Sequence, residues 1–183
     1  MGIGVPPSLA GCLHHSSSAP RAPPPGWIKF KVDGSLSPSG RASFRMVARN
    51  DRDALIFVVG FPMLHWDPGE VEPAAVLALR KLIPPSLYGV HMAIMEGDCS
   101  SLMDSCAAGL RRGDWSVMVD GEEDFSFLSG FPQLQFQHIG REANRAADFC
   151  ARFALRENFV WLDVDSTHSE FAELIRADLD DML

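Results

Sequence analysis

From residue 27 onward, hydrophobic and polar residues alternate in the pattern of a half-buried β-strand. Over residues 27–33 the apolar and the charged side chains fall on opposite faces. The apolar ones are Ile28, Phe30 and Val32, and the charged ones are Lys29, Lys31 and Asp33. Turn-forming residues follow, and residues 42–49 and 54–61 predict two further strands. Three consecutive strands joined by short turns predict an antiparallel meander.

Helices and strands then alternate along the chain. Residues 70–83 have apolar side chains at helical spacing and are followed by prolines, which stop a helix. Residues 90–95 and 134–139 predict the fourth and fifth strands, and residues 100–110 and 141–155 predict two more helices. The element order β-β-β-α-β-α-β-α predicts an α/β fold, with a mixed five-stranded sheet flanked by helices.

The two ends of the chain differ in composition from this middle part. Residues 1–26 hold six of the 13 prolines and no acidic residue, which predicts a disordered Pro/Ser-rich arm; an organellar transit peptide is the alternative. Residues 158–183 predict an acidic tail, with a helix over about 169–179. The predicted domain between them spans residues 27–157.

Length and composition limit the class of protein. A chain of 183 residues with 46% hydrophobic residues is long enough for one domain with a core. Its longest apolar run, residues 54–64, contains a glycine and a proline and is shorter than the roughly 20 residues that cross a bilayer. The four cysteines show no zinc-like spacing and are interpreted as reduced thiols. These features predict an intracellular protein without a membrane partner; nuclear, cytoplasmic and organellar locations all stay open.

The net charge of −8 does not exclude nucleic acid as a partner, because the charge is unevenly distributed. Residues 157–183 contain eight acids and one base, which leaves a net charge of −1 for the first 156 residues. The only dense basic group predicts a phosphate-binding surface, with a solvated outer sheet face as the alternative. Its members are Lys29, Lys31, Arg41, Arg45 and Arg49.

Four acidic residues have distinctive positions relative to the predicted elements. They are Asp33 at the end of the first strand, Glu72 in the first turn of the first helix, Asp98 after the fourth strand and Asp148 on the polar face of the last helix. They are far apart in sequence, so only the fold can bring them together. Each has an ordinary explanation as well, as a solvated carboxylate or as an acid that favours a helix N-terminus.

Segments around these acids resemble the motifs of plant-type ribonuclease H domains, which belong to the ribonuclease H-like superfamily and often accompany retroelement reverse transcriptases. Residues 23–35, PPPGWIKFKVDGS, resemble the opening motif, and residues 138–148, HIGREANRAAD, resemble the closing motif. Glu72 with the apolar residues three and four positions later resembles the helix motif of the family, and residues 95–99, MEGDC, resemble its strand-four motif. The resemblance covers residues 23–155.

The resemblance implies an endonuclease that hydrolyses the RNA strand of RNA–DNA hybrids. The implied site has four carboxylates and two Mg²⁺ ions, with Mn²⁺ as a substitute, and hard oxygen ligands suit both ions. Asp33 would bridge the ions, Glu72 and Asp98 would hold one, and Asp148 the other. His138 would carry protons. Arg141 and Asn144 would position the substrate, and no protein partner is indicated.

The sequence also departs from the family pattern. The hairpin at residues 39–44, SGRASF, is not glycine-rich as in the family, and Asp53 stands where a turn glycine is expected. Two alternatives therefore stay open beside the hybrid ribonuclease. One is a nucleic-acid-binding module of the same fold that does not turn over its substrate, and the other is a retroelement-derived remnant.

Overall fold

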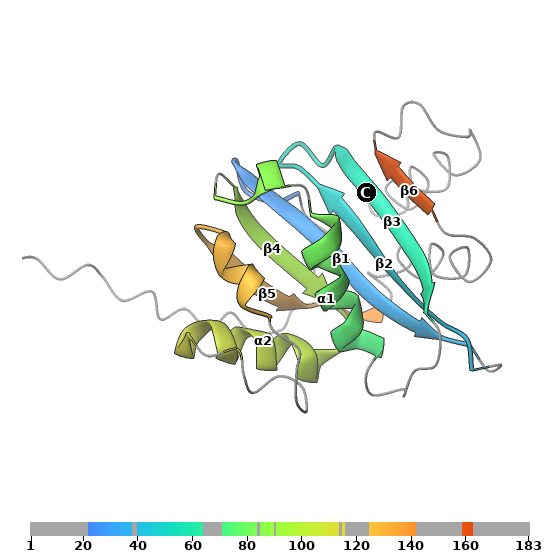
Figure 1. The fold of residues 1–183 in the computed structure, drawn as a ribbon. Coiled ribbons are helices and arrows are strands. Elements are labelled where there is room, and N and C mark those ends of the chain that lie inside the picture. Colours follow the sequence, from blue (N-terminus) through green and yellow to red (C-terminus); the bar gives the residue numbers. More distant parts are fainter. Residues whose placement is uncertain are drawn as a thin grey trace, which may run out of the picture.

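The described residues form a single twisted sheet with helices packed on one face, shown as a ribbon in Figure 1. The computed structural model describes residues 22–37, 40–63, 71–83, 85–89, 91–113, 115, 125–141 and 159–162. The strands are β1 (Trp27–Leu36), β2 (Ala42–Arg49), β3 (Leu55–Met63), β4 (Met92–Gly97), β5 (Leu134–His138) and β6 (Phe159–Leu162). Their order in the sheet is β5-β4-β1-β2-β3-β6.

The sheet is mixed, as the order of elements predicts. Strands β1, β2 and β3 form the antiparallel meander, with Asp33 opposite Arg45 and Arg45 opposite Gly60. Strand β4 pairs in parallel with β1, and β5 pairs in parallel with β4, because each is reached through a helical crossover. The predicted α/β class is confirmed. The sheet also has a sixth strand, β6, which is antiparallel to β3 and lies at the start of the predicted tail.

The helices of the described chain pack on one face of this sheet. Helix α1 (Val71–Leu82) lies against β1 and β2, and α2 (Ser100–Arg112) lies against β4 and β5 (Figure 1). Two short 3-10 helices, η1 (Pro85–Leu87) and η2 (Phe125–Gly130), were not predicted. Helix α2 is followed by Gly113, which has a left-handed φ of 66°. Its backbone N–H donates to the carbonyl oxygens of Gly109 and Leu110 and so caps the helix.

The hydrophobic core fills the space between the sheet and the two helices. The apolar positions of the first strand, Ile28, Phe30 and Val32, are all at most 3% exposed and contact α1 residues such as Leu79. From α2, Cys106 is fully buried in the same core. The period-two and helical patterns of the sequence therefore identify the core face correctly.

The opposite face of the sheet buries charged side chains. Cross-strand pairing places the odd-numbered residues of β1, the odd-numbered residues of β2 and Glu96 of β4 on this face. Its charged members are all at most 7% exposed: Lys29, Lys31, Asp33, Arg45, Arg49 and Glu96. The predicted phosphate-binding surface and the solvated alternative are therefore both wrong for its four lysine and arginine residues, because these side chains are not accessible to a ligand or to water. Arg41 alone in the predicted basic group is exposed.

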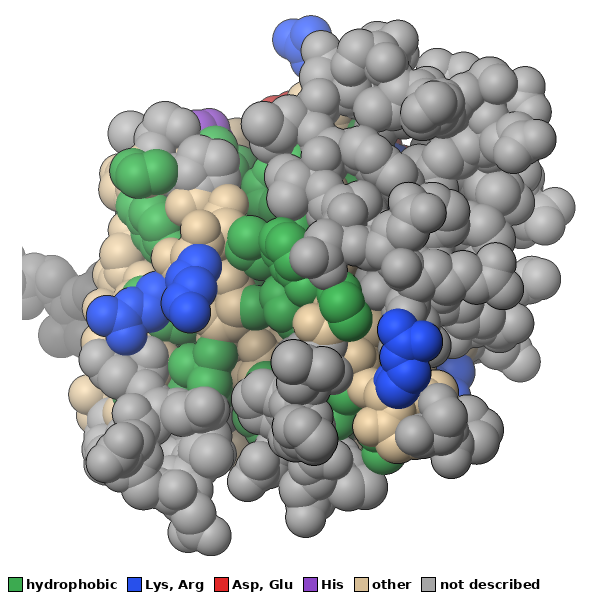
Figure 2. Space-filling model, turned by 45° about the vertical axis from the view of Figure 1, so that its right-hand side comes forward, with side chains coloured by type: hydrophobic (Ala, Val, Ile, Leu, Met, Phe, Trp, Pro, Cys, Tyr) green, Lys and Arg blue, Asp and Glu red, His purple; other side chains and the backbone are tan. Residues whose placement is uncertain are grey.

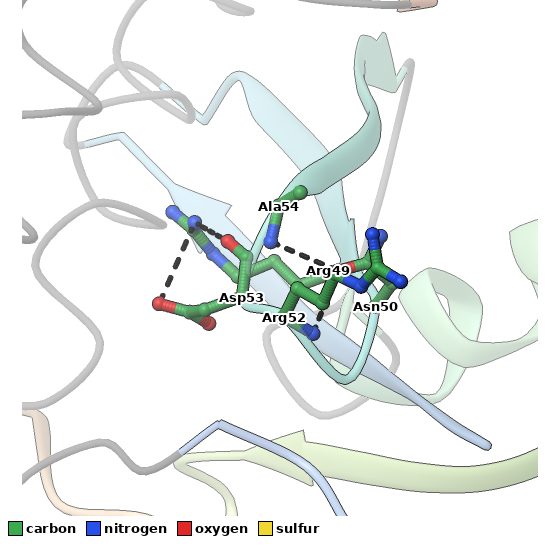
Figure 3. A network of polar contacts seen from close by, with 5 residues as sticks. All are labelled: Arg49, Asn50, Arg52, Asp53 and Ala54. Atoms are coloured by element: carbon green, nitrogen blue, oxygen red, sulfur yellow. Dashed lines mark hydrogen bonds and ion pairs between the residues drawn. The ribbon is translucent and has the colours of Figure 1, made fainter. Parts of the chain in front are cut away.

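The turn between β2 and β3 is held by side chains instead of glycine. The Asn50 side-chain oxygen accepts hydrogen bonds from the backbone N–H groups of Arg52 and Ala54, at 2.9 and 3.0 Å (Figure 3). Asp53 has a φ of 60°, and its carbonyl oxygen accepts a hydrogen bond of 2.9 Å from Arg49. Aspartate tolerates the left-handed region better than most residues, so Asp53 supplies the conformation for which a glycine was expected.

Several predictions of boundaries are corrected by the structure. Strand β1 runs past Asp33 to Leu36, because its last residues pair with β2, so Asp33 lies inside the strand and not at its end. The predicted helices over 141–155 and 169–179 and most of the arm over 1–26 lie outside the described residues. In the described part of the chain, no helix has the length and apolar character needed to span a membrane.

Candidate nucleic-acid site

The candidate site lies where the parallel strands β1, β4 and β5 come to their carboxyl ends. Strands β1 and β4 are in register up to Lys31 and Glu96, and the next same-face positions along them are Asp33 and Asp98. Strand β5 ends at His138, opposite Gly97 of β4. We call the region formed by Asp33, Asp98, His138 and Arg141 the carboxyl edge.

The first turn of α1 reaches the carboxyl edge because Gly34 has no side chain. A Cβ atom on Gly34 would lie 2.9 Å from the backbone oxygen of Val71, which is closer than real Cβ atoms approach a carbonyl. The glycine after Asp33 therefore allows the start of α1 to lie directly against β1. Glu72 follows Val71, so its backbone lies at the start of α1, next to the residue that contacts Gly34. The Glu72 side chain is not among the described ones.

Asp98 contacts both His138 and Arg141 at the carboxyl edge. The His138 Nε2 atom lies 3.2 Å from the Asp98 carbonyl oxygen, which can only accept, so the Nε2–H is the donor. The Arg141 Nε atom lies 3.8 Å from Asp98 Oδ2, and the Arg141 side chain is 93% exposed. The backbone N–H of Ile139 also donates to the Gly97 carbonyl, at 3.0 Å, which fixes the end of β5 on β4.

Asp33 is ion-paired with Arg45 across the β1–β2 ladder. The two residues are directly opposite in the register, and the Arg45 guanidinium contacts Asp33 Oδ2. The Arg45 side chain is fully buried and the Asp33 side chain is 10% exposed. The sequence identifies Arg45 only as a member of the predicted basic group. The signal that could have found the pair is the hairpin register, which places residues 33 and 45 opposite each other once 36 is paired with 42.

A second buried ion pair lies one strand away on the same face. The Lys29 Nζ and Glu96 Oε1 atoms are 3.0 Å apart, and both side chains are 6% exposed. Lys29 and Glu96 come from β1 and β4, so this pair joins the two central parallel strands. These two ion pairs therefore connect strands of the sheet and are buried from solvent.

The remaining predicted site residues are only partly visible. Asn144 and Asp148 lie outside the described residues, as does the Glu72 side chain. The structure thus brings Asp98 into contact with His138 and Arg141 and places Asp33 on the neighbouring strand. The proposed roles of these residues stay predictions. Among the residues described with their side chains, no three of the types His, Cys, Asp and Glu form a group that could hold a metal ion.

The Asp33 environment does not fit the two-magnesium arrangement that the family resemblance implies. A bridging ligand needs carboxylate oxygens that can turn toward two cations. Here an oxygen of Asp33 contacts a guanidinium that is buried and permanently charged. Asp98, by contrast, is partly exposed, and the described partner of its carboxylate is the solvent-exposed Arg141.

The basic side chains visible on one outer face do not form a continuous patch. Figure 2 shows the Lys and Arg side chains of the described residues as small, separate groups on that face. Recognition of a polyanion by the described residues of this face would therefore depend on individual contacts, and not on a broad positive surface.

Comparison with known proteins supports the architecture described above. A family model described as reverse transcriptase-like matches residues 31–154. Ribonuclease H1 of the halophilic archaeon Halobacterium salinarum superposes with a TM-score of 0.57 and 19% identity, over 71% of this chain and 98% of that one. No curated protein matches the chain.

Two further solved structures are similar in fold. One is LC11 ribonuclease H1, isolated from compost and solved in complex with an RNA/DNA hybrid, with a TM-score of 0.51 and 17% identity over 70% of this chain and 96% of that one. The other is a foamy viral protease-reverse transcriptase in complex with double-stranded DNA, with a TM-score of 0.52 and 14% identity over 75% and 97%. At these identities the likeness establishes the fold alone.

Proposed function

The chain belongs to the reverse transcriptase-like family, with a ribonuclease H-like fold, and on this basis we propose that it binds RNA–DNA hybrids at the carboxyl edge. The observation that carries the proposal is the contact of Asp98 with exposed His138 and Arg141, which come from the end of β5 and the residues after it. The substrate class follows from the family and from the fold-related LC11 ribonuclease H1, which was solved with such a hybrid.

The side chains exposed along β5 and after it suit this ligand. Gln135 and Gln137 are exposed on β5 and can both donate and accept hydrogen bonds, as recognition of 2′-hydroxyl groups in a shallow minor groove requires. Arg141 can bind a phosphate through its guanidinium. These groups can recognise the shape and the backbone of a duplex through individual contacts.

Hydrolysis of the RNA strand by a metal-dependent carboxylate site is the second candidate function. The positions of Asp33 and Asp98 on neighbouring parallel strands, with His138 in contact, favour it. The ion pair between Asp33 and Arg45 opposes it, because the carboxylate that would bridge the two ions is already occupied. We therefore place binding without turnover first.

Fluorescence anisotropy of labelled duplexes in EDTA tests the binding proposal. We expect the RNA–DNA hybrid to bind more tightly than double-stranded DNA of the same sequence. We also expect Arg141→Ala to weaken binding and to reduce the slope of log Kd against log salt concentration by about one, because one phosphate contact is lost.

Arg52→Ala is the matched control, since Arg52 is exposed in the β2–β3 turn, at the opposite end of the sheet from the carboxyl edge. Equal weakening by both substitutions, or no hybrid binding by the folded protein, would contradict the proposal. The same samples with Mg²⁺ and an end-labelled RNA strand test the second candidate. Cleavage that is abolished by Asp33→Asn would put the ribonuclease in first place.

A further inference from the structure

The ion pair between Asp33 and Arg45 is built into the most constrained part of the sheet. Both residues belong to central strands, since β1 lies between β4 and β2, and β2 lies between β1 and β3. Directly opposite residues of an antiparallel pair have Cβ atoms about 5 Å apart on the same face. The backbone therefore holds the guanidinium next to the Asp33 carboxylate.

Displacement of the Arg45 guanidinium from Asp33 is energetically unfavourable. Its side chain is fully buried, and a guanidinium stays charged at every pH at which the protein is folded. Withdrawing it from Asp33 would separate two opposite charges inside the protein, which is strongly unfavourable. A metal ion in solution competes for Asp33 against a cation that is covalently attached to the neighbouring strand.

We propose that Arg45 is a tethered cation that takes the place of a divalent metal ion at Asp33. The chain would then keep the carboxyl edge for binding hybrids, while its Asp33 carboxylate is closed to metal. This inference deepens the proposed function, because it concerns the same edge. It is tested with the metal alone, in the absence of nucleic acid.

Two substitutions of Arg45 separate its charge from its bulk. Arg45→Met removes the charge and keeps a long side chain, and Arg45→Lys keeps a cation at the same position. With Mn²⁺ as the probe, titration calorimetry should show affinity at least about tenfold higher for Arg45→Met than for the wild type. Arg45→Lys should remain close to the wild type. Equal Mn²⁺ affinity of all three folded proteins would overturn the proposal.

The unsubstituted protein provides a second measurement, which does not depend on whether Arg45→Met folds. Diamagnetic Mg²⁺ shifts the NMR signal of the carboxylate carbon that it binds, without the long-range broadening that Mn²⁺ causes. We expect the Cγ signal of Asp98 to shift at lower Mg²⁺ concentration than the Cγ signal of Asp33. A shift at Asp33 that equals or precedes that at Asp98 would show that metal reaches Asp33 and would refute the proposal.

Failure of this inference is distinguishable from failure of the proposed function. Hybrid binding is measured in EDTA, where no divalent ion is present, and metal binding is measured without hybrid. A wild-type protein that binds metal at Asp33 and also binds hybrids would overturn the role of Arg45 alone. A protein that excludes metal from Asp33 but binds no hybrid would overturn the proposed function alone.

Discussion

Individual residues in this chain take positions that depend on their immediate neighbours. Asp53 has a left-handed backbone in a turn that also contains hydrogen bonds from Arg49 and to Asn50, so β2 and β3 are joined without a glycine. Their pairing continues to the turn with one register shift, between Ala48 and Arg49. Cys106 shows the effect of surroundings on chemistry. Burial in the core raises the pKa of its thiol to about 12.

The raised pKa of Cys106 predicts a specific loss of stability at high pH. The native state keeps the thiol neutral, whereas the unfolded chain ionises it near its usual value of 9.0. The unfolded state therefore loses this proton first, and stability falls as the pH rises from about 9 to about 12. By pH 10 the contribution of this group to the free energy of unfolding falls by about 1.4 kcal/mol.

Urea denaturation of the wild type and of Cys106→Ala at pH 8 and pH 10 measures this loss. The difference in unfolding free energy between the two proteins isolates Cys106 from the other groups that titrate in this range. A difference that does not change between the two pH values would contradict the prediction. Mass mapping after thiol alkylation at pH 9 is an independent check, with Cys99, which is partly exposed, modified before Cys106.

At the scale of elements, the two faces of β1 are stabilised by different interactions. Its apolar face contacts α1, and its charged face forms ion pairs with both neighbouring strands. The pair between Lys29 and Glu96 connects β1 to β4 on the sheet face opposite the helical core. Replacing only one member of such a pair is strongly unfavourable, because the remaining buried charge loses its counter-ion.

A double-substitution cycle on Lys29 and Glu96 tests this role. We expect Lys29→Met and Glu96→Leu each to lower the unfolding free energy by about 3–5 kcal/mol, and the double variant to lose less than the sum. Denaturant titration measures all four proteins. Arg141→Met is the matched control, because its ion pair with Asp98 is solvent-exposed and should contribute less than about 1 kcal/mol. Additive losses for Lys29 and Glu96 would refute the coupling.

The sequence predicts the elements better than it predicts what their polar faces do. Alternation identified β1 and its apolar side, and helical spacing identified α1 and α2 to within a few residues. The same alternation cannot distinguish a solvated charged face from a buried one, so Lys29 and Arg45 were assigned to the surface. Strand β6 was missed because its four residues, FVWL, are apolar without alternation and pair with a strand distant in sequence.

The candidate site was predictable to the extent that it depends on topology. Parallel strands that end at the same edge bring Asp98 and His138 together, and the motif spacing anticipated both. The partner of Asp33 was not anticipated, because cross-strand contacts depend on the register of a hairpin and not on any local motif. Whether a metal ion can bind at Asp33 therefore depends on Arg45, which lies outside all the motifs that resemble the family.

At the scale of the whole molecule, the sheet combines close and distant strand pairs. Leu36 pairs with Ala42 within one hairpin, whereas Phe57 pairs with Leu162 more than a hundred residues later. The parallel pairs of β1 with β4 and of β4 with β5 lie between these extremes and need the crossovers through α1 and α2. Closing a longer loop has a larger entropic penalty, so these pairs differ in how readily they form.

This strand order has a consequence for the path of folding. The local meander of β1, β2 and β3 should form in the folding transition state, and β5 should join later. The φ value of Val47→Ala in β2 should therefore exceed that of Leu134→Ala in β5, and stopped-flow kinetics that gave the reverse order would contradict this path. Because Asp33 and Arg45 both belong to the meander, the guanidinium reaches the carboxylate before the parallel strands arrive, and the carboxyl edge is assembled around an aspartate that already has its cation.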